Sequence, residues 1–206
     1  MEPQERQDPQ EPQEEAAEVG PVHAAHRHNP YAYLMDGPRL DALLTRLGRR
    51  RAASVRCNRA VSPERAPRGV YPRPAMAFVV MDPTAGPWVP NEDAVLGTVT
   101  VGEGGSAFLP YAAAKAAGHR RLGGNYGEAV LVDPHLCGTE NFRYGHSVQV
   151  RGVIVGASGQ SPDQDLYEAG ALATDLIAAI AELHLAWEER VGPGEWFTPD
   201  GLPPAR

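Results

Sequence analysis

Hydrophobic residues concentrate between about residue 36 and residue 190, and their spacing predicts three helices and four strands. A leucine stripe at positions i, i+3, i+4 and i+7 predicts the first helix over residues 38–53, with Asp36 as its N-cap. Arginines cover the other faces of this helix. The stripe consists of Leu40, Leu43, Leu44 and Leu47.

Short apolar runs predict the strands. The first two cover residues 75–81 and 94–101, and an Asp-Pro turn closes the first of them. Residues 144–150 and 151–155 follow as a hairpin about Arg151-Gly152. The end of that run is β-branched and uninterrupted, which is typical of a strand covered on both faces. Gly156 to Gly159 is then predicted to be a turn that admits close approach.

The second helix is predicted over residues 109–122, with Pro110 in its first turn and Gly123 beyond its end. Lys115 and His119 lie one turn apart on it. We expect a face of small residues to lie close to the sheet. That face comprises Tyr111, Ala114, Ala117 and Gly118.

The last helix has the clearest start in the chain. Ser161 and Gln164 form a capping box, and Pro162 occupies the first helical position, so a helix is predicted over residues 162–190. Its apolar face is expected to pack on the sheet. The members of that face are Leu166, Ala169, Ala173, Leu176, Ile177, Ile180, Leu183 and Trp187.

These elements indicate one α/β (α+β) domain with a mainly antiparallel central sheet flanked by helices. The domain is predicted over residues 30–192. Residues 1–29 are expected to be a disordered acidic tail rich in Pro, Gln and Glu, and residues 193–206 a flexible C-terminal tail. The tail prediction includes three histidines, which we interpret as solvated rather than as a metal site. They are His23, His26 and His28.

The charge is unevenly distributed. The chain has a net charge of −7, but residues 1–19 hold seven acidic groups and one arginine, whereas residues 39–73 hold ten arginines and two acidic groups. These two segments could attract each other. The arginine-rich stretch has no interleaved aromatic residues and the whole chain is acidic, which disfavours nucleic acid as a partner.

Cysteine usage and hydropathy restrict the environment of the protein. Cys57 and Cys137 are far apart and outside any CxxC pair, so we expect reduced thiols and neither a zinc site nor a disulfide framework. The N-terminus is acidic, and no apolar run approaches about 18 residues. These features predict a cytoplasmic protein without membrane association.

Four motifs occur in the order seen in the GlcG/HbpS-like (haem-degrading domain) family. They are Ala77–Pro83, Ala112–Ala116, Gly145–Gly159 and Gln164-Asp165, followed by a terminal helix. Over residues 36–190 the chain resembles a divergent member of that family. Tyr144-Gly145-His146 stands where the family often has Gly-Gly-Pro. The resemblance implies a profilin-like fold, a homo-oligomer, and binding of haem or, as the alternative, a corrinoid.

The resemblance also implies a cofactor-binding site at Lys115, His119, Tyr144 and His146. His146 or His119 would be the axial ligand of haem iron, and Lys115 would pair with a propionate. Each has a structural alternative: a local hydrogen bond for His146, a helix-end position for His119, and a salt bridge for Lys115.

Other chemical motifs are incomplete. Asp82 precedes a proline in a turn and Asp165 lies in a first helical turn, so structural roles suffice for both carboxylates. His135 and Cys137 do not make a dyad signature. The run Gly152–Gly159 lacks the Gly-Lys-Ser/Thr of a phosphate loop and misses the G-x-S-x-G pattern by one residue.

The expected function is therefore binding of haem or a related tetrapyrrole or small ligand, and whether the protein is an enzyme stays open. One alternative is a small-molecule enzyme or accessory factor that reuses the same fold. Another is a ligand-free interaction protein in which residues 46–59 engage an acidic partner or the chain's own tail.

Overall fold

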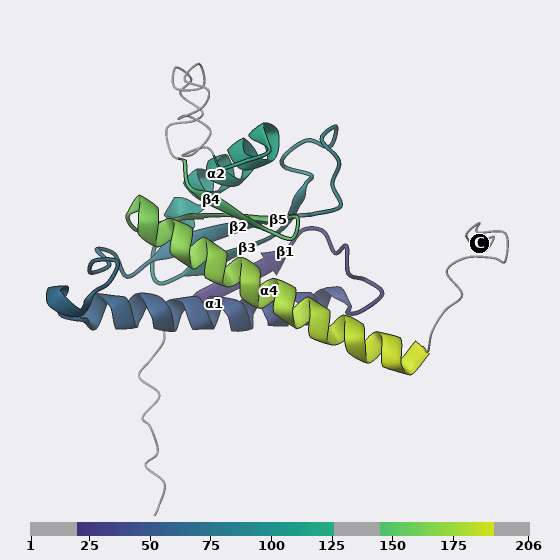
Figure 1. Cartoon of the computed structure of the whole chain (residues 1–206), viewed down its shortest axis with the longest axis horizontal. Helices are drawn as coiled ribbons and strands as arrows, with labels where there is room; N and C mark the ends of the chain where they lie inside the picture. Colours follow the sequence, from purple (N-terminus) through teal and green to yellow (C-terminus); the bar gives the residue numbers. More distant parts are fainter. Residues whose placement is uncertain (1–19, 126–144, 192–206) are drawn as a thin grey trace, which may run out of the picture.

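The computed structural model describes residues 20–125 and 145–191. These residues form a five-stranded, wholly antiparallel sheet with the order β1-β3-β2-β5-β4 and three α-helices, as Figure 1 shows. The mixed α/β class and the antiparallel sheet flanked by helices are thus confirmed. The strands are β1 (Val22–His26), β2 (Met76–Met81), β3 (Val95–Val101), β4 (Ser147–Val150) and β5 (Val153–Ser158).

The helices cover the two faces of the sheet. Helices α1 (Gly37–Ala60) and α4 (Pro162–Val191) lie on one face, and α2 (Leu109–Leu122) lies on the other (Figure 1). Two short 3-10 helices lie in the connections. They are η1 (Pro63–Arg65), between α1 and β2, and η2 (Gly105–Phe108), between β3 and α2. Alternate residues of β2 therefore enter two separate cores, with Phe78 under α1 and α4 and Val79 under α2.

Several local predictions are confirmed. The Asp36 side chain accepts from the backbone N–H of Arg39 and caps α1. Gly123 ends α2 in the left-handed conformation. Ser161 and Gln164 make both capping-box hydrogen bonds at the start of α4. Arg151 and Gly152, with φ of 47° and 90°, form the tight turn of the β4–β5 hairpin.

The prediction that the domain begins near residue 30 is wrong, because β1 occupies part of the predicted tail. This strand pairs with β3 from Val22↔Val101 to His26↔Gly97. Val22 and Ala24 pack against the core under α1, and His26 bonds to Asp41. The pairing depends on a strand about 75 residues later in the chain, so local composition did not reveal it.

The predicted turn at Gly156–Gly159 is also wrong in part, because β5 continues to Ser158. Gly156 lies inside the strand, where α2 passes directly over it. A Cβ at this position would overlap the carbonyl oxygen of Ala112 and come within 2.8 Å of the backbone nitrogen of Ala116. The glycine therefore serves close helix packing within a strand.

The buried face of α2 includes Gly118 of the predicted face and otherwise differs from the prediction. Its buried side chains include Ala112, Lys115, Ala116 and His119, whereas Tyr111 is 46% exposed. Helix α1 continues to Ala60, beyond the predicted end at residue 53. In α4 the predicted core positions Ala169, Ala173, Leu176 and Ile180 are buried, but Leu183 is 40% exposed.

Helix α4 also bears on the prediction of no membrane association. By length and composition alone α4 could span a membrane, although it contains no uninterrupted apolar run of about 18 residues. Its N-terminal half packs on β4 and β5 and buries three charged or polar side chains, as the core helix of a globular domain does. These are Gln164, Asp165 and Glu168.

Candidate functional site

A cavity of about 450 Å³ lies where α2, the end of β5 and the start of α4 meet. It brings together three of the motifs that carry the family resemblance, although they are distant in sequence. The lining residues are Arg73, Phe108, Tyr111, Lys115, Gly145, His146, Ser158, Gly159, Gln160, Pro162 and Asp165.

Lys115 and Asp165 form a buried ion pair at the base of this cavity. The Nζ atom of Lys115 lies 2.7 Å from Oδ2 of Asp165 and donates to the carbonyl oxygen of Ala157 at 2.8 Å. The two side chains are only 5% and 4% exposed. The structural alternative considered for Lys115, a salt bridge, is therefore present, and the pair joins α2 to α4 across the end of β5.

Asp165 holds a second connection. Its Oδ1 accepts from the backbone N–H of Gln160, which fixes the glycine-containing link before α4. Burial raises the pKa of the Asp165 carboxyl above its ordinary value and outweighs the opposing effects of Lys115 and of the hydrogen bonds. The interaction with Lys115 thus opposes the effect of burial on this carboxyl without cancelling it.

The predicted histidines occupy different environments. His146 is half-buried, lines the cavity and has a φ of 78°, a left-handed conformation that the Asn125 side chain supports by accepting from its backbone N–H. His119 is 4% exposed, lies 2.8 Å through Nδ1 from the Ser147 hydroxyl and is not part of the cavity lining. Tyr144, His135 and Cys137 lie outside the described residues.

Arg73 is a cavity residue that the sequence analysis missed. Its guanidinium donates to the carbonyl oxygen of Gly159 at 2.9 Å and lies 5.8 Å from the centre of the Phe108 ring. Gln160 clamps its backbone, accepting from the N–H at 3.1 Å and donating to the carbonyl at 2.9 Å. The available signal was an arginine held between Pro72 and Pro74 directly before a strand.

A second polar cluster, also missed, lies between α1 and α4. Glu168 has no exposed surface and accepts from Ser54 at 2.6 Å, Tyr71 at 2.9 Å and Arg51 at 3.2 Å. Burial, followed by the charge of Glu168, raises the pKa of Tyr71 well above its ordinary value. This cluster contributes no residue to the cavity, so its role is to join the helices.

The remaining carboxylate candidate, Asp82, lies in the turn that follows β2. Asp82 is 5% exposed, accepts twice from Thr84 at 2.7 Å and lies 3.1 Å from Nε2 of His28, which makes it a turn residue as predicted. Among residues 20–125 and 145–191, no group of three or more His, Cys, Asp or Glu residues is arranged to hold a metal ion.

Comparison with known proteins found no family model, curated protein or solved structure that matches the chain.

Proposed function

We propose that this protein binds a small carboxylate-bearing ligand in the cavity between α2, β5 and α4, and that the ligand is haem or a related tetrapyrrole. The observation that carries the proposal is the convergence of Arg73, Lys115 and His146 on one cavity. Its volume of about 450 Å³ lies in the range of about 300–1,000 Å³ that is usual for small-molecule sites.

The lining supports distinct roles for its side chains. Arg73 offers a guanidinium, which suits a carboxylate, beside the ring of Phe108, which suits a planar ligand. A lysine ammonium has three donors, and Lys115 uses two of them within the protein. Lys115 therefore has one donor left for a ligand, and Arg73 is the better partner for a propionate.

The fit to haem rests on His146. Among the described residues it is the one histidine in the cavity lining, and its imidazole would hold the iron through a ring nitrogen. His119 does not fit this role, because its ring is buried against Ser147 outside the cavity. The chemistry that haem supplies when bound is coordination or redox chemistry at the iron.

A haem titration followed by absorbance tests the proposal. We expect a saturable Soret shift near one haem per chain, with the affinity reduced at least about tenfold in His146→Ala and unchanged in the control His23→Ala, an exposed histidine on β1. Arg73→Lys should bind more weakly than the wild type and more tightly than Arg73→Met. A nonsaturating response, or full affinity in His146→Ala, would overturn the proposal.

A further inference from the structure

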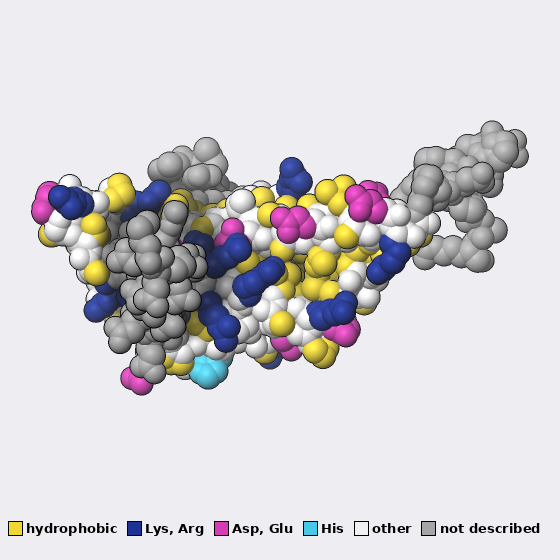
Figure 2. Space-filling model, turned by 90° about the horizontal axis from the view of Figure 1, so that it is seen from below, with side chains coloured by type: hydrophobic (Ala, Val, Ile, Leu, Met, Phe, Trp, Pro, Cys, Tyr) yellow, Lys and Arg dark blue, Asp and Glu magenta, His cyan; other side chains and the backbone are white. Residues whose placement is uncertain are grey.

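The solvent-facing side of α1 is strongly basic. Six of its arginines are exposed, and its one acidic residue, Asp41, is bonded to His26. Figure 2 shows Lys and Arg side chains distributed over the face that α1 and α4 form. Arg50 pairs with Asp175, whereas Arg46 and Arg49 form no ion pair with any residue in the described ranges. This surface therefore retains positive charge that the described fold does not neutralise.

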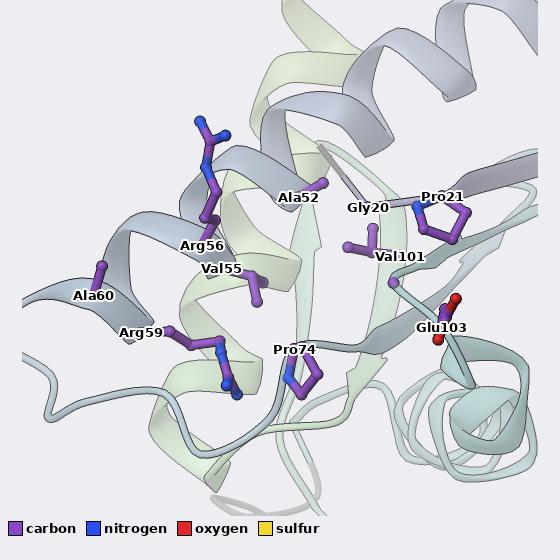
Figure 3. A pocket seen from close by; sticks show the side chains of 11 residues that line it. Gly20, Pro21, Ala52, Val55, Arg56, Arg59, Ala60, Pro74, Val101 and Glu103 are labelled. Atoms are coloured by element: carbon purple, nitrogen blue, oxygen red, sulfur yellow. The ribbon is translucent and has the colours of Figure 1, made fainter. Parts of the chain in front are cut away.

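A cavity of about 800 Å³ adjoins this basic surface and is distinct from the proposed ligand site (Figure 3). Ala52 and Val55 of α1 and Val101 of β3 give it an apolar floor. Arg59 extends toward Pro74 on one side, and the acidic Glu103 lies on the opposite side. The cavity thus suits a partner that has both apolar and acidic groups.

The chain enters the described fold at this cavity, because Gly20 and Pro21 are part of its lining. Residues 1–19, which precede them, hold seven acidic groups and one arginine. The four residues that directly precede Gly20 are Ala16-Ala17-Glu18-Val19, which combine small apolar side chains with a carboxylate. The composition of this segment therefore complements both the apolar floor and the arginines.

We propose that the acidic segment 1–19 binds in this cavity and along the arginines of α1, and so covers the basic surface of its own chain. Nineteen residues can span up to about 60 Å, which exceeds the length of about 36 Å that a 24-residue helix has. Covalent attachment at Gly20 keeps the acidic groups near α1 at an effective concentration of the order of millimolar. The inference concerns a different surface from the ligand site and stands without it.

Paramagnetic relaxation in the full chain tests this inference. Cys57 is exposed on α1 beside Arg56, so a nitroxide can be attached there in a Cys137→Ser background. In ¹⁵N-labelled protein, we expect the amides of residues 5–15 to lose at least about twofold more signal at low salt than in about 0.5 M NaCl, because salt screens exposed charge pairs. The comparison uses one protein in two buffers and requires no change of fold.

Charge variants separate attraction from mere attachment at Gly20. Glu14→Gln/Glu15→Gln/Glu18→Gln, which alters no described residue and removes three of the seven acidic groups, should reduce the salt-dependent part of the signal loss. Arg46→Gln/Arg49→Gln should reduce it, whereas Arg46→Lys/Arg49→Lys and Arg151→Gln should retain it. Arg151 is an exposed arginine on the β4–β5 turn, and its variant controls for the loss of a single positive charge elsewhere on the surface.

Two outcomes would overturn the inference. One is a signal loss in residues 5–15 that is identical in both buffers and in the Gln variants. The other is signal loss in a ¹⁵N-labelled Cys57→Ser chain mixed with an unlabelled chain that carries the nitroxide, because the segment would then bind a second copy. Neither result would affect the haem titration, so the two proposals fail separately.

Discussion

Two buried clusters of charged residues, of similar chemistry, sit in different surroundings. Glu168 is sealed between α1 and α4, with no exposed surface and three donors aimed at it. The Lys115–Asp165 pair is almost as deeply buried, but it also lines the cavity between α2, β5 and α4. Both clusters join helices, so burial alone does not mark a residue that is open to a ligand. Only the Lys115–Asp165 pair, of these two clusters, lines that cavity.

Substitution of Glu168, in the cluster between α1 and α4, should cause the largest loss of stability. Glu168→Ala removes the acceptor of the Ser54 and Tyr71 hydroxyls, and it leaves Arg51, whose side chain is 12% exposed, with its ion pair to Asp175 at 3.3 Å. We expect a loss of about 3–5 kcal/mol in the free energy of unfolding, measured with urea. Glu182→Ala, exposed on the same helix, should change it by less than about 0.5 kcal/mol. Equal effects of the two variants would contradict a joining role.

Loss of the Lys115–Asp165 ion pair beside the cavity should cost less stability than loss of Glu168. Lys115→Met is expected to cost about 1–3 kcal/mol, because Asp165 can take up a proton and water can enter from the cavity. In the double variant Lys115→Met/Asp165→Asn most of that cost should be recovered, since no buried charge remains and the amide oxygen can still accept from the backbone N–H of Gln160. Urea unfolding of both variants measures this difference. A double variant less stable than Lys115→Met would count against the interpretation.

The pH dependence of Lys115→Met sharpens the same comparison. The pKa of Asp165 is already raised by burial above the ordinary value of 3.8, and removal of Lys115 raises it further. The folded state then binds the proton before the unfolded state does, so its stability increases as the pH falls toward that value and decreases as the pH rises through the folded pKa. The cost of Lys115→Met should therefore be smaller at about pH 4.5 than at pH 7. A cost that grows on acidification would refute this.

Close packing of α2 on β5 should give an intermediate effect. Gly156→Ala places a Cβ against the backbone of Ala112 and Ala116, which cannot move without shifting the helix. We expect a loss of about 1–3 kcal/mol in thermal or urea unfolding. Gly124→Ala is the matched control, because a Cβ there has nothing within 4 Å. If both variants unfold alike, α2 does not pack as described.

The smallest expected loss of stability concerns the hydrogen bonds between His26 of β1 and Asp41 of α1. Asp41 is 40% exposed and accepts from the backbone N–H and from Nδ1 of His26, so Asp41→Ala should cost at most about 1 kcal/mol. Partial burial raises the pKa of Asp41, but the hydrogen bonds from His26 lower it overall, so this stabilisation is present above pH 3.8 and is lost as the pH falls through the folded value. Unfolding at pH 7 and about pH 3 measures the change, with Asp93→Ala as control. A difference that persists at the lower pH would contradict the assignment.

The sequence alone correctly predicted the features whose stabilising contacts come from residues nearby in the chain. The Asp36 cap, the capping box of Ser161 and Gln164, and the Arg151-Gly152 turn all involve residues within a few positions of one another. The leucine stripe of α1 and the apolar run of β2 were equally readable, because their burial follows the helix and strand periods. These signals correctly gave the class of the fold.

The candidate site was predictable only in part. Lys115 and His146 were identified from the family resemblance, and both line the cavity. Arg73 was missed, because the loop that carries it is held by Gln160 from the other end of the fold. His119 was an incorrect candidate for the cavity. It lies one helical turn after Lys115, but its ring contacts Ser147, and the sequence does not reveal this contact.

Tertiary structure decided the features that depend on distant partners. Residues 22–26 are a strand because β3 offers an edge and α1 covers it, and Gly156 remains in β5 because α2 approaches its backbone. Asp165 belongs to the cavity, although its place in a first helical turn suggested a purely local role, because Lys115 reaches it from a helix 50 residues earlier. Hydrophobic periodicity and capping residues indicate which helix or strand a segment can form by itself. Strand pairing, the close approach of a helix to a strand and buried ion pairs depend on which segments the folded chain brings together.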